Sequence, residues 1–229
     1  MILSHHLELL LSLSLFLSFF PAFRLVLFPI QIFTTWVHEC SHALAAFLLG
    51  GTSIKITLSK DGSGLTYYKI PAGKLKRSLI ASSGYLGASL FGCILFSLSI
   101  FAERGSKLFT FNHLIICLCT LMSVSLLIWV RNLFGSMSIF VLGTALASLL
   151  YSPMNQYAAE LILFLAIQTA LNALFDIRIL FSIGNQQRTT SDAHTLQALF
   201  YLPAWFWAGL WLVMSGGMMG FSLVKLNLT

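Results

Sequence analysis

Long apolar runs separated by two polar segments set the pattern of this sequence. The runs are about 17–25 residues long, which is the length that an α-helix needs to cross the hydrocarbon core of a bilayer. They lie at residues 7–23, 25–50, 78–101, 112–130, 133–150, 157–181 and 199–223. The polar segments are residues 52–77 and 182–198, and the second is expected to be a loop. The pattern predicts an all-α polytopic membrane protein with about six to seven transmembrane helices, six if the short first run does not cross.

The first polar segment is expected to fold as a small β-hairpin. Residues 53–59 alternate polar and apolar side chains, residues 65–70 form the partner strand, and Asp61-Gly62-Ser63-Gly64 supplies the turn. An unpaired edge of such a hairpin could bind an extended substrate strand by β-augmentation. A hairpin with no role in substrate binding fits the sequence equally well.

The composition agrees with a membrane protein, since 58% of the residues are hydrophobic and only 9% are charged. An ordinary soluble domain is about 25% charged. A single membrane-embedded domain over residues 1–229 is expected, with the lipid bilayer as its surroundings.

The net charge of +6 comes largely from Lys and Arg beside the spans, which argues against nucleic acid as a partner. Nine of these cations fall on the side of residues 52–77 and four on the other, so the positive-inside rule places the hairpin in the cytoplasm, as in a bacterial cytoplasmic membrane. The sequence sets no oligomeric state.

The run at 25–50 contains the motif His38-Glu39-x-x-His42 and ends at Gly50-Gly51. In an α-helix His38 and His42 lie one turn apart on the same face, so both imidazoles can reach one tetrahedral zinc ion. Glu39 is close enough to accept a proton from the zinc-bound water, whose pKa the metal lowers to about 7. Two histidines and a glutamate inside a span need an explanation, because one charged residue at a helix centre costs at least ~2.5 kcal/mol. A structural polar cluster or a proton relay is the alternative to a metal site. The motif predicts a zinc site with Glu39 as the catalytic base.

A catalytic zinc needs a third protein ligand, and two aspartates are candidates. Asp176 lies in an otherwise apolar run, at a depth of ~8 Å from one end, whereas His42 lies ~12 Å from the matching end of its own helix. Asp176 is therefore the first choice, and a local pair with Arg178 is the alternative explanation for it. Asp192 is the rival ligand if the polar segment folds back into the membrane. Asn172, one turn before Asp176, could bind the substrate backbone or orient the aspartate.

The run at 78–101 has small residues at Gly84, Ala88 and Gly92, spaced four apart. This spacing forms a face that lets two helices approach closely, and helix packing is the default explanation. Such a smooth face could also leave room for substrate beside the motif helix, which makes Gly84 and Gly87 candidate substrate-binding residues.

The sequence resembles the site-2-protease class of intramembrane zinc metalloproteases, in particular the small bacterial and plant branch without a PDZ domain. The matching pieces are His-Glu-Cys-Ser-His-Ala-Leu-Ala-Ala, Leu-Leu-Gly-Gly, the hairpin and Ser83-Gly84-Tyr85-Leu86-Gly87-Ala88-Ser89, with looser matches around Asn172 and at Ser191-Asp192-Ala193. The resemblance implies a zinc held by two helix histidines and an aspartate, and a substrate that is a membrane helix cut near the cytoplasmic face. Larger members carry a Leu-Asp-Gly pattern that this chain lacks.

The function expected from the sequence is that of an intramembrane zinc endopeptidase acting on transmembrane or membrane-proximal peptides. A non-proteolytic membrane protein with a structural zinc site, or an assembly factor, is the alternative. A transporter with a His/Glu relay is a third reading, disfavoured because the sequence has no second intramembrane charged cluster and no inverted repeat.

Overall fold

The computed structural model describes residues 2–19, 24–104, 109–151, 153–183 and 191–228, and these are mostly helical (79%). The helices are α1 (Ile2–Phe19), α2 (Arg24–Leu48), α3 (Lys74–Glu103), α4 (Phe111–Ile128), α5 (Leu133–Ser148), the 3₁₀ helix η2 (Pro153–Tyr157), α6 (Ala158–Ile183), α7 (Asp192–Phe200) and α8 (Ala204–Leu228). Strands β1 (Thr52–Leu58) and β2 (Gly64–Lys69) form the expected hairpin. The prediction of a helical protein with a small hairpin after the motif helix is confirmed.

The predicted number of six to seven spans is not confirmed. Among the described residues, three helices are long and apolar enough to cross a membrane: α3, α4 and the part of α8 from Ala204 to Val224. Leu133–Ser148 and Pro153–Asn172 would add a fourth span if this pair, bent by 97°, acts as one. The motif helix α2 is not among them, because its polar side chains dilute the apolar run.

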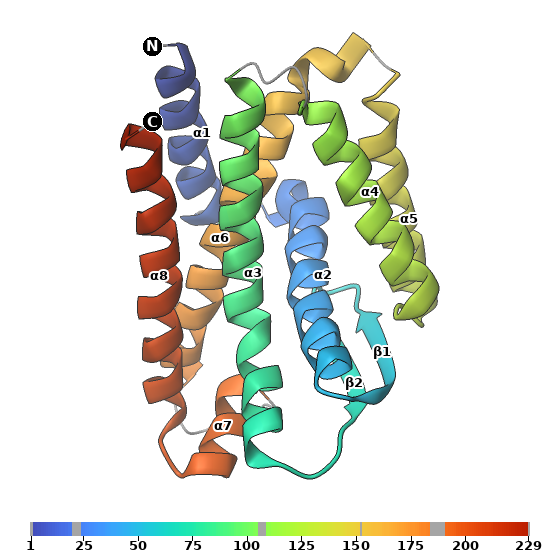
Figure 1. The fold of residues 1–229 in the computed structure, drawn as a ribbon, viewed down its shortest axis with the longest axis vertical. Coiled ribbons are helices and arrows are strands. Elements are labelled where there is room, and N and C mark those ends of the chain that lie inside the picture. The colour runs from blue at the N-terminus through green and yellow to red at the C-terminus, as the bar shows by residue number, and fades with distance from the viewer. Residues whose placement is uncertain (1, 20–23, 105–108, 152, 184–190, 229) are drawn as a thin grey trace.

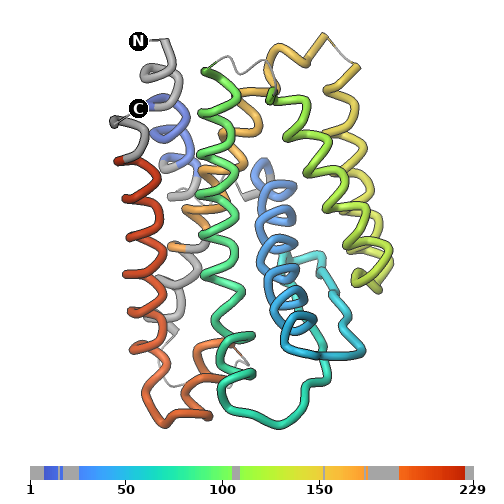
Figure 2. The backbone as a smooth tube through the Cα atoms, viewed as in Figure 1, coloured from blue at the N-terminus to red at the C-terminus, as the bar shows by residue number. Residues whose placement is uncertain are grey.

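Helix α3 is the central element of the bundle (Figure 1). It packs against α6, α2 and α8, and α2 lies between α3 and the hairpin (Figure 2). Gly92 allows the contact with α6, because a Cβ atom there would lie 2.8 Å from the backbone nitrogen of Ala170. The small-residue face predicted for this helix is therefore used for close helix packing.

The motif helix ends as its glycines predict. Gly50 has a φ of +84°, a left-handed conformation that glycine adopts without strain. The backbone N–H of Gly51 then donates to the carbonyl of Ala46 at 2.7 Å. This cap turns the chain directly into β1, so the hairpin returns along α2.

Strand β1 is paired along both of its edges. It pairs antiparallel with β2, with Ile56 opposite Thr66. On the other edge, the N–H of Ile56 donates to Trp129 O at 2.8 Å and its carbonyl accepts from the N–H of Arg131 at 3.0 Å. The Asn132 side chain continues this edge, because it both donates to Leu58 O and accepts from Leu58 N. The connection between α4 and α5 thus covers β1, and in the described part no further strand pairs with the outer edge of β2.

The expectation of a loop over residues 182–198 is wrong for its second half. Helix α7 begins at Asp192, with Ser191 as the N-cap, whose side chain accepts a hydrogen bond from the N–H of His194. Ala193 and Leu196 are buried against α3 and α8. The polar average composition of this segment did not indicate a short helix whose one buried side is apolar. Residues 184–190 lie outside the described residues.

Candidate metal centre

Helix α2 places the two motif histidines side by side, as their spacing predicts. His38 and His42 have their Nε2 atoms 3.0 Å apart, and their rings meet edge to face with centroids 4.7 Å apart. His42 is 6% exposed, and its Nδ1 lies 2.7 Å from the carbonyl oxygen of Ile80. A proton on Nδ1 would be donated to that carbonyl, which leaves the Nε2 lone pair free to bind a metal.

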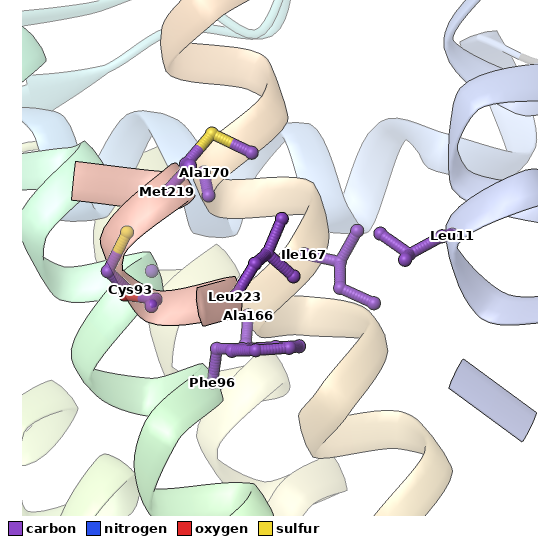
Figure 3. Close-up of a pocket in the computed structure, with 10 residues that line it drawn as sticks. Leu11, Cys93, Phe96, Ala166, Ile167, Ala170, Met219 and Leu223 are labelled. Carbon is purple, nitrogen blue, oxygen red and sulfur yellow. The ribbon is translucent and has the colours of Figure 1, made fainter. Parts of the chain in front are cut away.

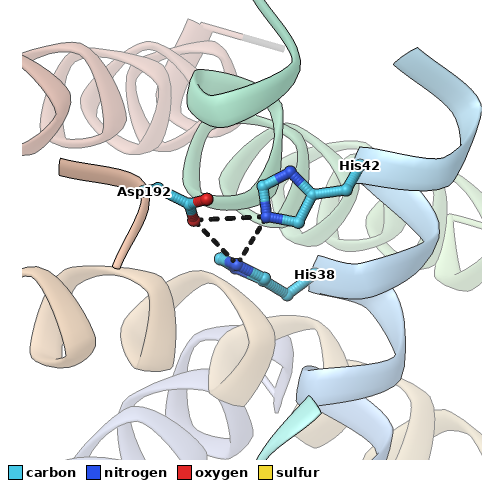
Figure 4. A group of neighbouring side chains, drawn as sticks. All are labelled: His38, His42 and Asp192. Atoms are coloured by element: carbon cyan, nitrogen blue, oxygen red, sulfur yellow. Dashed lines mark hydrogen bonds and ion pairs between the residues drawn. The ribbon is translucent and has the colours of Figure 1, made fainter. Parts of the chain in front are cut away.

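Asp192, the first residue of α7, brings a carboxylate to the same point. Its Oδ2 lies 3.4 Å from His38 Nε2 and 3.2 Å from His42 Nε2, as Figure 4 shows. Burial raises the pKa of Asp192, but the charge that His42 and His38 carry when they are protonated, together with their hydrogen bonds, outweighs burial and holds this pKa below its usual range. With its Oδ2 beside both imidazoles, Asp192 offers an oxygen ligand to a cation bound there.

The three side chains fit the geometry of a zinc site. Zinc with bonds of about 2.0–2.1 Å keeps its tetrahedral ligand atoms about 3.3–3.4 Å apart, close to the three separations given above. Two imidazole nitrogens and one carboxylate oxygen are also a donor set that zinc accepts in catalytic sites, with the fourth position left for water or substrate.

Gly84 on α3 keeps the space beside these atoms free. A Cβ atom at this position would overlap the Nε2 atoms of both His38 and His42. Tyr85, the next residue, packs edge-on against the His38 ring, with centroids 4.8 Å apart, and stacks on Trp211 of α8. Helix α3 therefore shapes the site in two ways, by leaving room at the nitrogens and by supporting one of the rings.

Glu39 lies next to the histidines and is nearly buried, with 6% of its surface exposed. It is not one of the three residues whose ligand atoms converge. Its Oε2 accepts a hydrogen bond of 2.6 Å from the hydroxyl of Thr66 on β2. Glu39 thus follows one of the three ligands directly in sequence and stands outside the ligand group, as expected of a base in this motif.

The remaining candidates from the sequence are Asp176 as a ligand and Asn172, Gly84 and Gly87 as substrate-binding residues. The side chain of Asp176, on α6, lies outside the described residues, so its role as a ligand stays a prediction. Asn172 donates to the hydroxyl of Thr34 at 3.2 Å, which ties α6 to α2 one turn before His38. A Cβ at Gly87 would lie 2.5 Å from Ser41 Oγ, so Gly87 serves the packing of α3 on α2. Substrate binding by Asn172, Gly84 and Gly87 stays a prediction.

Sequence reasoning missed the contact between Thr66 and Glu39. The only signal was the alternation of β2, which places Thr66 on the same face of the hairpin as the buried Ile56. That alternation shows which face is covered, but not that α2 covers it.

A small pocket lies between α1, α3, α6 and α8 (Figure 3). It has a volume of about 40 Å³ and an almost wholly apolar lining that includes Leu11, Phe96, Ile167 and Met219. It contains none of the three converging ligands.

A comparison with protein families assigns the chain to a peptidase family. The family model described as Peptidase M50B-like matches residues 9–222 of the chain. The protein therefore belongs to the Peptidase M50B-like family, which is the site-2-protease family. No curated protein and no solved structure matches it. The apolar helices and the family together indicate an integral membrane protein of a metallopeptidase class.

Proposed function

We propose that this protein is an intramembrane zinc endopeptidase, in which His38, His42 and Asp192 hold the metal and Glu39 is the general base. The observation that carries the proposal is the convergence of three ligand atoms, at a point where Gly84 leaves space, on a helix that also carries a buried glutamate next in sequence to His38. Asp192 is chosen over Asp176 because its carboxylate reaches both imidazoles.

Zinc bound there would supply a Lewis acid that polarises a peptide carbonyl and lowers the pKa of water. The protein's own residues do the remaining work. Glu39 accepts a proton at a carboxylate oxygen and delivers it to the nitrogen of the leaving amine. His42 is kept in the ligating tautomer by Ile80 O, and the ring of His38 is held by Tyr85.

The substrate we propose is a transmembrane or membrane-proximal peptide that unwinds before cleavage. The backbone of an intact membrane helix is internally hydrogen-bonded and cannot enter the site. The outer edge of β2 is the edge of the hairpin that could receive such an extended segment, because both edges of β1 are paired. Lys55, Lys60 and Lys69 lie exposed on the hairpin, which supports a cytoplasmic orientation by the positive-inside rule.

Removal of the metal tests this function. The purified protein is reconstituted in liposomes with a pool of single-span model peptides, and new peptide termini are read by mass spectrometry. Treatment with 1,10-phenanthroline is expected to reduce cleavage to background, and added Zn²⁺ is expected to restore it, because both the base and the ligands act only around the metal. Full cleavage by metal-free protein would contradict the proposal, and bound zinc without any cleavage in the pool would favour a structural site.

A further inference from the structure

The β-hairpin packs on, and is hydrogen-bonded to, the face of α2 that carries Glu39. Gln31, Thr35 and Glu39 are four residues apart and lie on one side of the helix. Thr35 donates from its hydroxyl to Gly62 O at 2.8 Å, in the turn of the hairpin. A Cβ atom at Gly64 would lie 2.6 Å from Glu39 Cγ, so β2 starts in direct contact with the glutamate side chain.

Thr66 makes the polar contact between the hairpin and this glutamate. Its Oγ1 lies 2.6 Å from Glu39 Oε2 and 3.0 Å from Glu39 O. A hydroxyl has one proton to donate, and the shorter distance is typical of a charge-assisted O–H···O⁻ bond. The proton therefore goes to the carboxylate oxygen Oε2, which fixes one end of the Glu39 side chain on the hairpin.

We propose that Thr66 is a positioning residue for Glu39: its hydroxyl fixes the carboxylate in the orientation that serves as base. This inference rests on the proposed function, since it assigns a helper to the base of that reaction. A glutamate has three rotatable bonds, and a nearly buried one needs a hydrogen-bond partner to hold a single orientation. The hairpin is thus part of the catalytic apparatus, in addition to any contact that it makes with substrate.

The test compares T66V, T66S and T57V in zinc-loaded protein, with the model peptide that the wild type cleaves fastest. Valine keeps the shape of threonine and removes the hydroxyl, whereas serine keeps the hydroxyl. Thr57 lies on the opposite face of the hairpin, and in the described structure its hydroxyl bonds only to Leu65 O. T57V is therefore a matched control. We expect T66V to lower kcat by about ten-fold with KM and zinc content unchanged, because it loses a hydrogen bond to a charged group. T66S and T57V should keep a kcat near that of the wild type.

A spectroscopic measurement reads the same contact without cleavage. The chain has four glutamates, Glu8, Glu39, Glu103 and Glu160, so protein labelled with ¹³C at the glutamate carboxyl gives few signals, and E39Q assigns that of Glu39. T66V should shift the Glu39 signal, and T57V should leave it in place.

Wild-type kcat and an unshifted Glu39 signal in T66V would overturn the proposal, as would a T66S variant as slow as T66V. If T66V does not fold, the pair T66A and T66S isolates the same hydroxyl, and equal kcat in that pair would overturn the proposal too. Failure of the proposed function looks different: the wild type would cleave nothing, or E39Q would cleave as fast as the wild type.

Discussion

Replacing Glu39 by glutamine is expected to abolish peptide cleavage while the protein keeps its zinc. Glutamine has nearly the same shape as glutamate but cannot accept a proton, and loss of a general base typically lowers a rate by about 10²- to 10⁴-fold. Zinc should remain because Glu39 is not one of the three converging ligands. The measurement is cleavage of the model-peptide pool together with zinc per chain.

The matched control for this variant is E8Q. Glu8 is exposed on α1, so the same chemical change there should leave cleavage and zinc content unaltered. Cleavage by E39Q at the wild-type rate would remove Glu39 from the mechanism. Loss of zinc in E39Q would instead make the glutamate part of the metal site.

The variant G84A is expected to weaken zinc binding by about 10- to 100-fold, the range seen when the supports of metal ligands are disturbed. The added methyl group would overlap the Nε2 atoms of His38 and His42. Neither ring can move without a loss, since one bonds to Ile80 O and the other packs on Tyr85. Zinc affinity is measured by competition with a chromophoric chelator.

A loss of zinc affinity in G84A cannot be attributed to a weakened helix, because alanine has a higher helix propensity than glycine. Glycine to alanine inside a helix normally stabilises the helix by up to ~1 kcal/mol, so α3 itself gains from the change. The control G143A on α5 should bind zinc like the wild type, because the atom nearest to its new Cβ is Met122 Sδ, at 3.9 Å. Wild-type zinc affinity in G84A would show that the metal does not sit between the two histidines.

The motif helix and the hairpin could be predicted because their signals are local. His38 and His42, four residues apart, define the histidine face of the helix, and Gly50-Gly51 defines where the helix ends. The alternation of residues 53–59 defines the strand.

The features that the sequence did not reveal depend on contacts between distant segments. The pairing of β1 with Val130 and Asn132 joins residues more than 70 positions apart, and the contact of Thr66 with Glu39 joins a strand to a helix face. No periodicity within one segment encodes either contact.

The identity of the third metal ligand also depends on a contact between distant segments, which no local pattern reveals. Depth along a helix is readable from the sequence, and it made Asp176 a candidate. Depth does not tell which way a side chain points around the helix axis. Asp192 looked less suited because its segment reads as a polar loop, yet capping by Ser191 starts a helix there and brings the carboxylate to the histidines.

Zinc content per chain, measured on detergent-purified wild type, D192A and D176A, is the most direct test of the proposed metal centre. A site built from His38, His42 and Asp192 predicts one zinc in the wild type and in D176A, and loss of zinc in folded D192A. Full zinc in D192A together with its loss in D176A would contradict that site and move the third ligand to α6.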